Sequence, residues 1–321
     1  STAMGGSLTA SGTLGGSKQA PLVKAVISAQ KLAFTEWTVE KINGDVNLKL
    51  AANNHSTVTL NATDFARGDV ALGQVDLSAS GTPESHHLAA SLDGPSGRVA
   101  LELVGGYVAG DWRGSINKFA LFEPRFGRWS LLDAAQLSVH KQRLDLARSC
   151  LKREVAVMCL SADKLSGEDG AASFELSQLP LALSNDFLPG TLSVDGALDG
   201  RGSVNIDSGV VSGQATFNTA AGVIHYRSDA DDDQTVTIRQ LEVALNATPS
   251  VFNISATGDL PQWLKLDLNA SQDRDDGQAL AGELHINAAD ISWLGEFEPR
   301  IAGSRGAARL DLLVRGTHRQ P

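Results

Sequence analysis

The sequence is poor in aromatic residues, cysteine and uninterrupted apolar runs, and each shortage excludes a class of protein. Only 5% of the 321 residues are aromatic and only two are cysteines. No apolar run approaches the ~18 residues of a membrane-spanning helix. One cysteine pair without clustered histidines cannot complete a zinc shell. The net charge of −10 leaves no dominant basic face, so we expect no nucleic-acid partner.

Motifs that carry catalysis are also missing. The chain has no G-x-S-x-G, no H-E-x-x-H, no P-loop and no pairing of a cysteine with a histidine. Its histidines are scattered and mostly lie beside turns. We therefore expect a protein that is not an enzyme and that uses neither a cofactor nor a metal ion.

Alternation of apolar and small polar residues is the main positive signal. Within residues 190–226, Leu192 and Val194 form one alternating pair, and Val204 and Ile206 form another. Alternation places every second side chain on the same face of a strand. Glycines separate these runs and allow the chain to turn back. The pattern predicts antiparallel strands with one apolar face and one polar face.

Most of the chain repeats this pattern, which defines the fold class. No segment places apolar residues at i, i+3, i+4 and i+7 over three turns, which excludes long helices and a parallel β–α–β fold. The first hundred residues predict roughly eight strands of about five residues each, joined by short loops. Residues 177–189 lack clean alternation and predict one helical turn or a loop. We expect an all-β, mostly antiparallel protein with few helical turns.

The domain organisation follows from the same repetition. Residues 1–4 have the character of a remnant of an expression vector and are left out of the fold prediction. Residues 5–321 are expected to form one elongated, repetitive β segment. A subdivision is expected near 105–135, where aromatic residues concentrate, and a new run of strands is expected from about residue 190.

The two cysteines are close enough in sequence to pair. Cys150 and Cys159 lie in two apolar-rich runs that flank a charged turn at Lys152–Glu154. A hairpin there brings both cysteines onto neighbouring strands, within reach of a disulfide. Such a bond is typical of an oxidising compartment such as the periplasm. The alternative is a pair of buried, reduced cysteines.

Several phrases of the sequence resemble a known family. The phrases are WRGSINKFALFEPRFGRWSL, CLKREVAVMCL and LSQLPLALSNDFLPGTLSVDGALDGRGSV, flanked by GTLGGSKQAPLV near the start and RGAARLDLLVRGTHRQP at the end. Their order and spacing are similar to the central part of the TamB family, which belongs to the AsmA-like, bridge-like lipid-transfer proteins. The family's N-terminal membrane anchor and its C-terminal end are not recognisable here, so we expect a middle fragment.

The resemblance implies a fold, a location and partners. The family forms a "β-taco", a long sheet curled into an open groove with a hydrophobic interior. It supplies the inner-membrane subunit of the translocation and assembly module, which is implicated in carrying phospholipids to the outer membrane and in assembling outer-membrane proteins. The expected location is the periplasm of a Gram-negative bacterium. The expected partners are phospholipid acyl chains and, through a C-terminal region not present here, the outer-membrane barrel TamA.

Combined with the alternation, the resemblance predicts which side chains line the groove. The expected lining residues are Val46, Leu48, Leu50, Val58, Leu60, Val70, Leu72, Leu101, Leu103, Leu144, Leu146, Leu192, Val194, Val204, Ile206, Phe217, Val236, Ile238, Leu241, Val243, Leu245, Phe252, Ile254, Leu264, Leu266, Leu268, Leu284, Ile286, Leu310 and Leu312. The alternative is an interaction or scaffold module for outer-membrane protein assembly, in which two apolar faces bury each other as a closed core. The alternation alone does not separate these two hypotheses.

Overall fold

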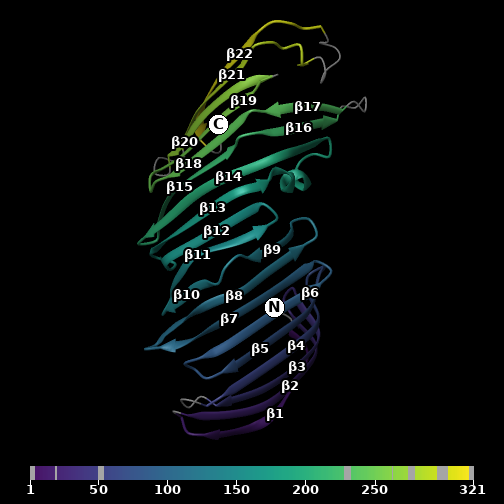
Figure 1. Cartoon of the computed structure of the whole chain (residues 1–321), viewed down its shortest axis with the longest axis vertical. Helices are drawn as coiled ribbons and strands as arrows, with labels where there is room; N and C mark the ends of the chain where they lie inside the picture. Colours follow the sequence, from purple (N-terminus) through teal and green to yellow (C-terminus); the bar gives the residue numbers. More distant parts are fainter. Residues whose placement is uncertain are drawn as a thin grey trace. The chain divides into compact units, whose positions relative to one another are not determined.

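The computed structural model describes residues 4–18, 20–49, 54–227, 233–261, 263–273, 279–294 and 303–317. The described residues form 22 β-strands and one short 3₁₀ helix, and every described strand pairing is antiparallel (Figure 1). The predicted all-β, antiparallel fold is confirmed. The chain divides into two compact units, Ser1–Arg153 and Glu154–Pro321, which are described separately below.

Unit 1 is an antiparallel meander in which most strands pair with the strands next to them in the sequence. Its strands are β1 (Met4–Gly16), β2 (Pro21–Phe34), β3 (Trp37–Lys49), β4 (Ser56–Arg67), β5 (Val70–Gly81), β6 (His86–Gly94), β7 (Gly97–Val108), β8 (Asp111–Glu123), β9 (Gly127–Leu131), β10 (Ala135–His140) and β11 (Arg143–Arg153). The strands β1–β8 are 9 to 14 residues long, so the expected five-residue strands are wrong. The prediction counted only clean alternation, whereas Ser, Thr, Asn and Gly continue the backbone ladder between apolar runs.

Register places the apolar residues of unit 1 on one face. Leu77 lies directly opposite Leu60 on one side and Ala90 on the other, and Ala90 lies opposite Leu101. Residues directly opposite each other in an antiparallel pair share a face. Two further rows run beside this one on the same face, Ala29–Ile42–Ala62–Val75–Leu92–Val99–Leu121–Trp129 and Ala25–Val46–Val58–Ala79–Leu88–Leu103–Ile116. We call this surface the apolar face of unit 1.

The residues between these rows make the opposite face polar. One row on that face is Val26–Asp45–Thr59–Ser78–Ala89–Glu102–Lys118, and another is Ser28–Asn43–Asn61–Asp76–Ser91–Ala100–Ala120. Hydroxyl, amide and charged side chains predominate in both rows. Unit 1 therefore has the one-sided character that the alternation predicted.

Unit 2 begins with a hairpin and a longer strand. Its elements are β12 (Ala156–Leu165), β13 (Gly170–Pro180), η1 (Leu181–Phe187), β14 (Leu192–Asp207), β15 (Val210–Thr219), β16 (Gly222–Arg227), β17 (Asp233–Ile238), β18 (Gln240–Ala247), β19 (Val251–Leu260), β20 (Leu264–Asp273), β21 (Ala279–Ala288) and β22 (Ala308–Thr317). The 3₁₀ helix η1 lies within residues 177–189, so of the two predicted alternatives, a helical turn or a loop, the structure has the helical turn.

The apolar residues of unit 2 also share a face across its main sheet. Phe217 lies opposite Val243, and Val243 lies opposite Ala256. The row continues through Leu268, Leu284 and Leu312 to the last strand. A parallel row on the same face is Leu160–Phe174–Gly202–Ala215–Leu245–Ile254–Ala270–Gly282–Val314. We call this surface the apolar face of unit 2.

The strand β14 belongs to two sheets. Its residues 199–207 pair with β15 in the main sheet, whereas its residues 192–196 pair with β16. The strand β16 pairs in turn with β17, and the main sheet continues from β15 directly to β18. The β16–β17 hairpin and the start of β14 therefore form a small second sheet, which branches from the main sheet near Gly196.

The place where the small sheet meets the main sheet contains several of the most buried side chains in the described part of unit 2. Val236 and Thr219 are 0% exposed and Ile238 is 5% exposed. A Cβ atom added to Gly222 would lie 3.4 Å from both Ile238 Cδ1 and Thr219 Cγ2, so these side chains pack closely around the glycine. The helix η1 is tied to this layer because the Val194 N–H donates a hydrogen bond to Asn185 Oδ1 at 2.8 Å. The branch point is a conventional packed core.

Both cysteines, Cys150 and Cys159, are disulfide-bonded, which confirms the predicted bond. A short loop closed by a disulfide stabilises the folded state by about 2–3 kcal/mol in the chain-entropy model. We expect urea unfolding in the presence of a thiol reductant to show a free energy of unfolding lower by this amount. The Cys150→Ser/Cys159→Ser double variant is the control, because reductant should leave its midpoint unchanged. An unchanged midpoint in the reduced wild-type protein would contradict the prediction.

Candidate functional site

Most of the predicted lining residues lie together on the two apolar faces. Those on the apolar face of unit 1 are Val46, Leu48, Val58, Leu60, Leu101, Leu103, Leu144 and Leu146. Those on the apolar face of unit 2 are Val204, Ile206, Phe217, Leu241, Val243, Leu245, Phe252, Ile254, Leu264, Leu266, Leu268, Leu284, Ile286, Leu310 and Leu312. Leu50 lies outside the described residues.

These faces are only partly shielded from solvent. Leu60, Leu101, Val243 and Leu268 each keep intermediate exposure. Val204, Leu310 and Leu312 are exposed by 40%, 51% and 46%. The buried apolar side chains among the described residues are few: Ala29, Ala62, Trp129, Ala135, Ala156, Cys159, Val236, Ile238 and Ala288. Two apolar faces that closed on each other would bury their large aliphatic residues instead.

Six predicted lining residues lie elsewhere. Leu192, Val194, Val236 and Ile238 are all in the small sheet of unit 2, where Val236 and Ile238 are buried. Val70 and Leu72 precede the register irregularity between β4 and β5, close to the hairpin turn, and Val70 is 51% exposed. We therefore restrict the candidate site to the two apolar faces.

The structure adds residues that the prediction left out. Leu77, Val75, Leu88 and Leu92 complete the rows of the apolar face of unit 1. Their alternation is visible in the sequence, and so they could have been included.

Phe174 completes an aromatic pair that spacing could not reveal. Its ring stacks on that of Phe217, with centroids 5.8 Å apart. A Cβ atom added to Gly202 would lie 2.5 Å from Phe174 Cε1, and one added to Gly200 would lie 2.7 Å from Phe217 Cδ1. The two glycines thus let both rings lie flat on the apolar face of unit 2.

One polar group is held on the apolar face of unit 1. The Trp112 indole Nε1–H donates a hydrogen bond to His86 Nε2 at 2.9 Å, and His86 Nδ1 lies 3.2 Å from the Thr82 carbonyl oxygen. The indole lies across Gly105 and Gly114, where an added Cβ atom would approach the ring to 2.5 and 2.7 Å. Near the β7–β8 hairpin, the apolar face of unit 1 therefore carries the amphipathic side chain of Trp112. Its indole N–H already has a hydrogen-bond acceptor in His86.

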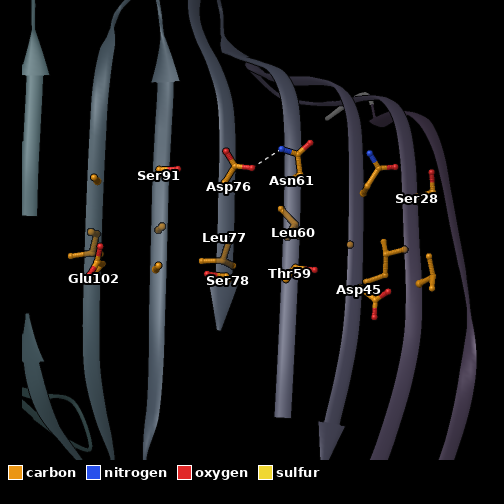
Figure 2. A pocket seen from close by; sticks show the side chains of 18 of the residues that line it. Ser28, Asp45, Thr59, Leu60, Asn61, Asp76, Leu77, Ser78, Ser91 and Glu102 are labelled. Atoms are coloured by element: carbon orange, nitrogen blue, oxygen red, sulfur yellow. Dashed lines mark hydrogen bonds between the residues drawn. The ribbon is translucent and has the colours of Figure 1, made fainter. Parts of the chain in front are cut away.

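The polar face of unit 1 carries a shallow depression of about 700 Å³ across β2–β8. Figure 2 shows that Asn61 and Asp76 face each other there across β4 and β5, with a 2.6 Å hydrogen bond from the amide to the carboxylate. Lys118 pairs with Glu102 at 3.1 Å on the same side. The lining of the depression combines these carboxylates and hydroxyls with residues of the middle row, among them Leu60, Leu77 and Leu101.

Three carboxyl groups near the surface have a lowered pKa. A hydrogen bond from the Arg125 side chain is the main cause at Glu123, one from Ser292 at Asp290, and one from His285 at Asp311. None of the three is a lining residue. Within the described ranges, no group of three or more His, Cys, Asp or Glu side chains is placed to hold a metal ion.

The described part of the chain contains no helix with the length and hydropathy that crossing a membrane requires. The architecture is thus a one-sided antiparallel sheet in each unit, with a small packed branch in unit 2. No solved structure matches the chain.

A family model described as "TamB, N-terminal domain" matches residues 2–321, which is almost the entire chain. This confirms the resemblance drawn from the sequence phrases. The matched description is that of the family's N-terminal domain, whereas the sequence phrases had suggested the central part of the family's proteins. The chain belongs to the TamB family of bacterial envelope proteins, which is linked to lipid or protein transport.

Proposed function

We propose that the apolar faces of this protein conduct phospholipids through the periplasm, between the inner and outer membranes. The observation that carries the proposal is the set of continuous apolar rows crossing successive strands while keeping intermediate exposure. In unit 1 such a row runs through Leu60, Leu77 and Leu101, and in unit 2 through Phe217, Val243 and Leu268. In unit 2 the small sheet packs at one end of these rows, where Thr219, which lies opposite Leu241, is 0% exposed.

The energetics explain why such a surface serves transport. Exposing acyl chains to water costs about 0.8 kcal/mol per CH₂ group, so two chains of membrane length meet a barrier on the order of 20 kcal/mol. An apolar floor that continues from strand to strand removes most of this cost without any chemical step. Aliphatic and small side chains make few directional bonds, so the lipid is not held at one position.

Site-specific photo-crosslinking in cells tests the proposal. A photo-reactive amino acid at Leu77 or Leu268 is expected to trap phospholipid, because both positions lie on the apolar faces. Asp76 and Asp267 are matched controls, since each is adjacent in sequence but lies on the opposite face. Adducts at the two aspartates and none at the two leucines would overturn the proposal.

A further inference from the structure

A basic cavity lies at the strand ends of unit 2, beside the apolar face. It has a volume of about 440 Å³ and lies where β19–β22 meet their connecting turns, in the green-to-yellow part of Figure 1. Its charged lining consists of three cations and one carboxylate, namely Arg239, Lys265, Arg309 and Asp259. This is unusual in a chain whose net charge is −10.

Strand register explains how these charges come together. Lys265 on β20 lies directly opposite Asp259 on β19 and Asn287 on β21, and Asn287 lies opposite Arg309 on β22. Adjacent strands are about 4.8 Å apart, so the backbones at Lys265 and Arg309, two strands apart, are separated by about 10 Å, which their long side chains can bridge toward one anion. The row is on the polar side of the sheet, one residue away from Leu264 and Leu266 on the apolar side.

The ion pairs of the two arginines of the cavity do not involve Lys265, so its ammonium group can bind an anion. Arg239 Nη1 pairs with Asp259 Oδ2 at 2.9 Å. Arg309 Nε pairs with Asp311 Oδ2 at 2.8 Å. Lys265 has no ion-pair partner among the residues that the structure describes. The guanidinium groups of Arg239 and Arg309 are themselves exposed, by 64% and 68%, and each keeps N–H donors that can turn to an incoming anion. Arg309 also donates from Nη2 to Asp311 Oδ1 at 3.2 Å, whereas Asp259 is only 22% exposed.

At the strand ends the lining of the cavity combines residues of both faces with an aromatic ring. Its lining includes Leu260 and Leu264, which lie opposite each other on the apolar side. Trp263 also lines the cavity, and its ring stacks on that of Trp293 with centroids 5.0 Å apart. Indole rings favour the boundary between an apolar and an aqueous environment.

We propose that this cavity binds the phosphate of a phospholipid headgroup while the acyl chains of the same molecule lie on the apolar face of unit 2. The assignment rests on the proposed lipid-conducting function and adds a site that orients the lipid. Lys265 and Arg309 contact the phosphate, and Trp263 borders the glycerol region. Charge-assisted hydrogen bonds from these cations provide the affinity for the phosphate.

Equilibrium binding to the whole chain tests the site with three probes. They are dihexanoyl phosphatidylglycerol, dihexanoylglycerol, which lacks the phosphate, and inorganic phosphate. We expect the wild-type protein to bind the phospholipid more tightly than the diacylglycerol. Lys265→Gln and, separately, Arg309→Gln should weaken phospholipid binding about tenfold and leave diacylglycerol binding unchanged.

Matched variants and the third probe distinguish a headgroup site from a general anion site and from the absence of lipid binding. Lys24→Gln and Arg315→Gln remove cations from the polar faces away from the cavity and should change neither affinity. Equal wild-type affinities for phospholipid and diacylglycerol would overturn the headgroup site and leave the conduit in place. Inorganic phosphate binding as tightly as the phospholipid would show an anion site unrelated to lipid. Failure of both lipids to bind would instead overturn the proposed function.

Discussion

Replacing Leu77 with aspartate is expected to abolish lipid binding by unit 1 while leaving the unit folded. Leu77 occupies the middle of an apolar row, between Leu60 and Ala90, and keeps intermediate exposure. The new carboxylate remains hydrated in the empty protein, so the cost to folding is about 1–2 kcal/mol, from the lost leucine contacts. An acyl chain on this face would have to dehydrate the charge, which costs several kcal/mol.

The measurement is the amount of phospholipid that a photo-reactive amino acid at Leu101, in the same apolar row of unit 1, traps in cells, together with a urea unfolding curve. Bound lipid should fall by roughly two orders of magnitude. Leu77→Met is the apolar control and should retain lipid. Ser78→Asp places the same charge on the polar face of the same strand and should also retain lipid.

The outcome separates the two functions that the sequence left open. If Leu77→Asp unfolds unit 1 as a core mutation would, the apolar face is a sealed core and the scaffold hypothesis gains support. If the variant folds and keeps its lipid, the apolar face is not the lipid path. Only a folded variant that no longer traps lipid on unit 1 agrees with the proposed conduit.

Replacing Val236 with aspartate is expected to have the opposite result, which is loss of the fold of unit 2. Val236 is 0% exposed, and the neighbouring buried side chains are Ile238 and Thr219. The substitution removes about 1.5–3 kcal/mol of apolar burial. It also places an unpaired carboxylate in a dry core, which costs several kcal/mol more.

Thermal or urea unfolding of Val236→Asp should therefore show a loss of at least about 4 kcal/mol, or no folded unit 2. Thr237→Asp is the matched control, because the next residue along β17 is exposed. A photo-reactive residue at position 236 should trap no lipid. Equal stability of the Val236→Asp and Thr237→Asp variants would show that the small sheet is not packed as described.

The alternation in the sequence was sufficient to predict the strands and the face on which each side chain lies. Side chains alternate with a period of two along any strand, so Leu264, Leu266 and Leu268 share a face whichever strands flank β20. The disulfide could also be predicted, because the spacing of Cys150 and Cys159 suits a hairpin. These features depend on residues close together in the chain.

The choice of strand partners depends on the tertiary structure, and alternation alone could not assign every predicted lining residue to one surface. Leu192 and Val194 alternate in the same way as Val204 and Ile206, although β14 pairs with β16 at the first two and with β15 at the others. Local periodicity is identical in the two cases. The burial of Val236 likewise follows from the packing of the small sheet rather than from the pattern of β17.

The sequence by itself determined that the chain makes one-sided antiparallel strands, because hydrophobic alternation acts over neighbouring residues. Only the tertiary structure decided where those strands branch into a second layer and which apolar side chains are buried there. It also placed Arg239, Lys265 and Arg309, which are far apart in the chain, around one cavity. Such placements depend on register between distant segments, and no short stretch of sequence encodes that register.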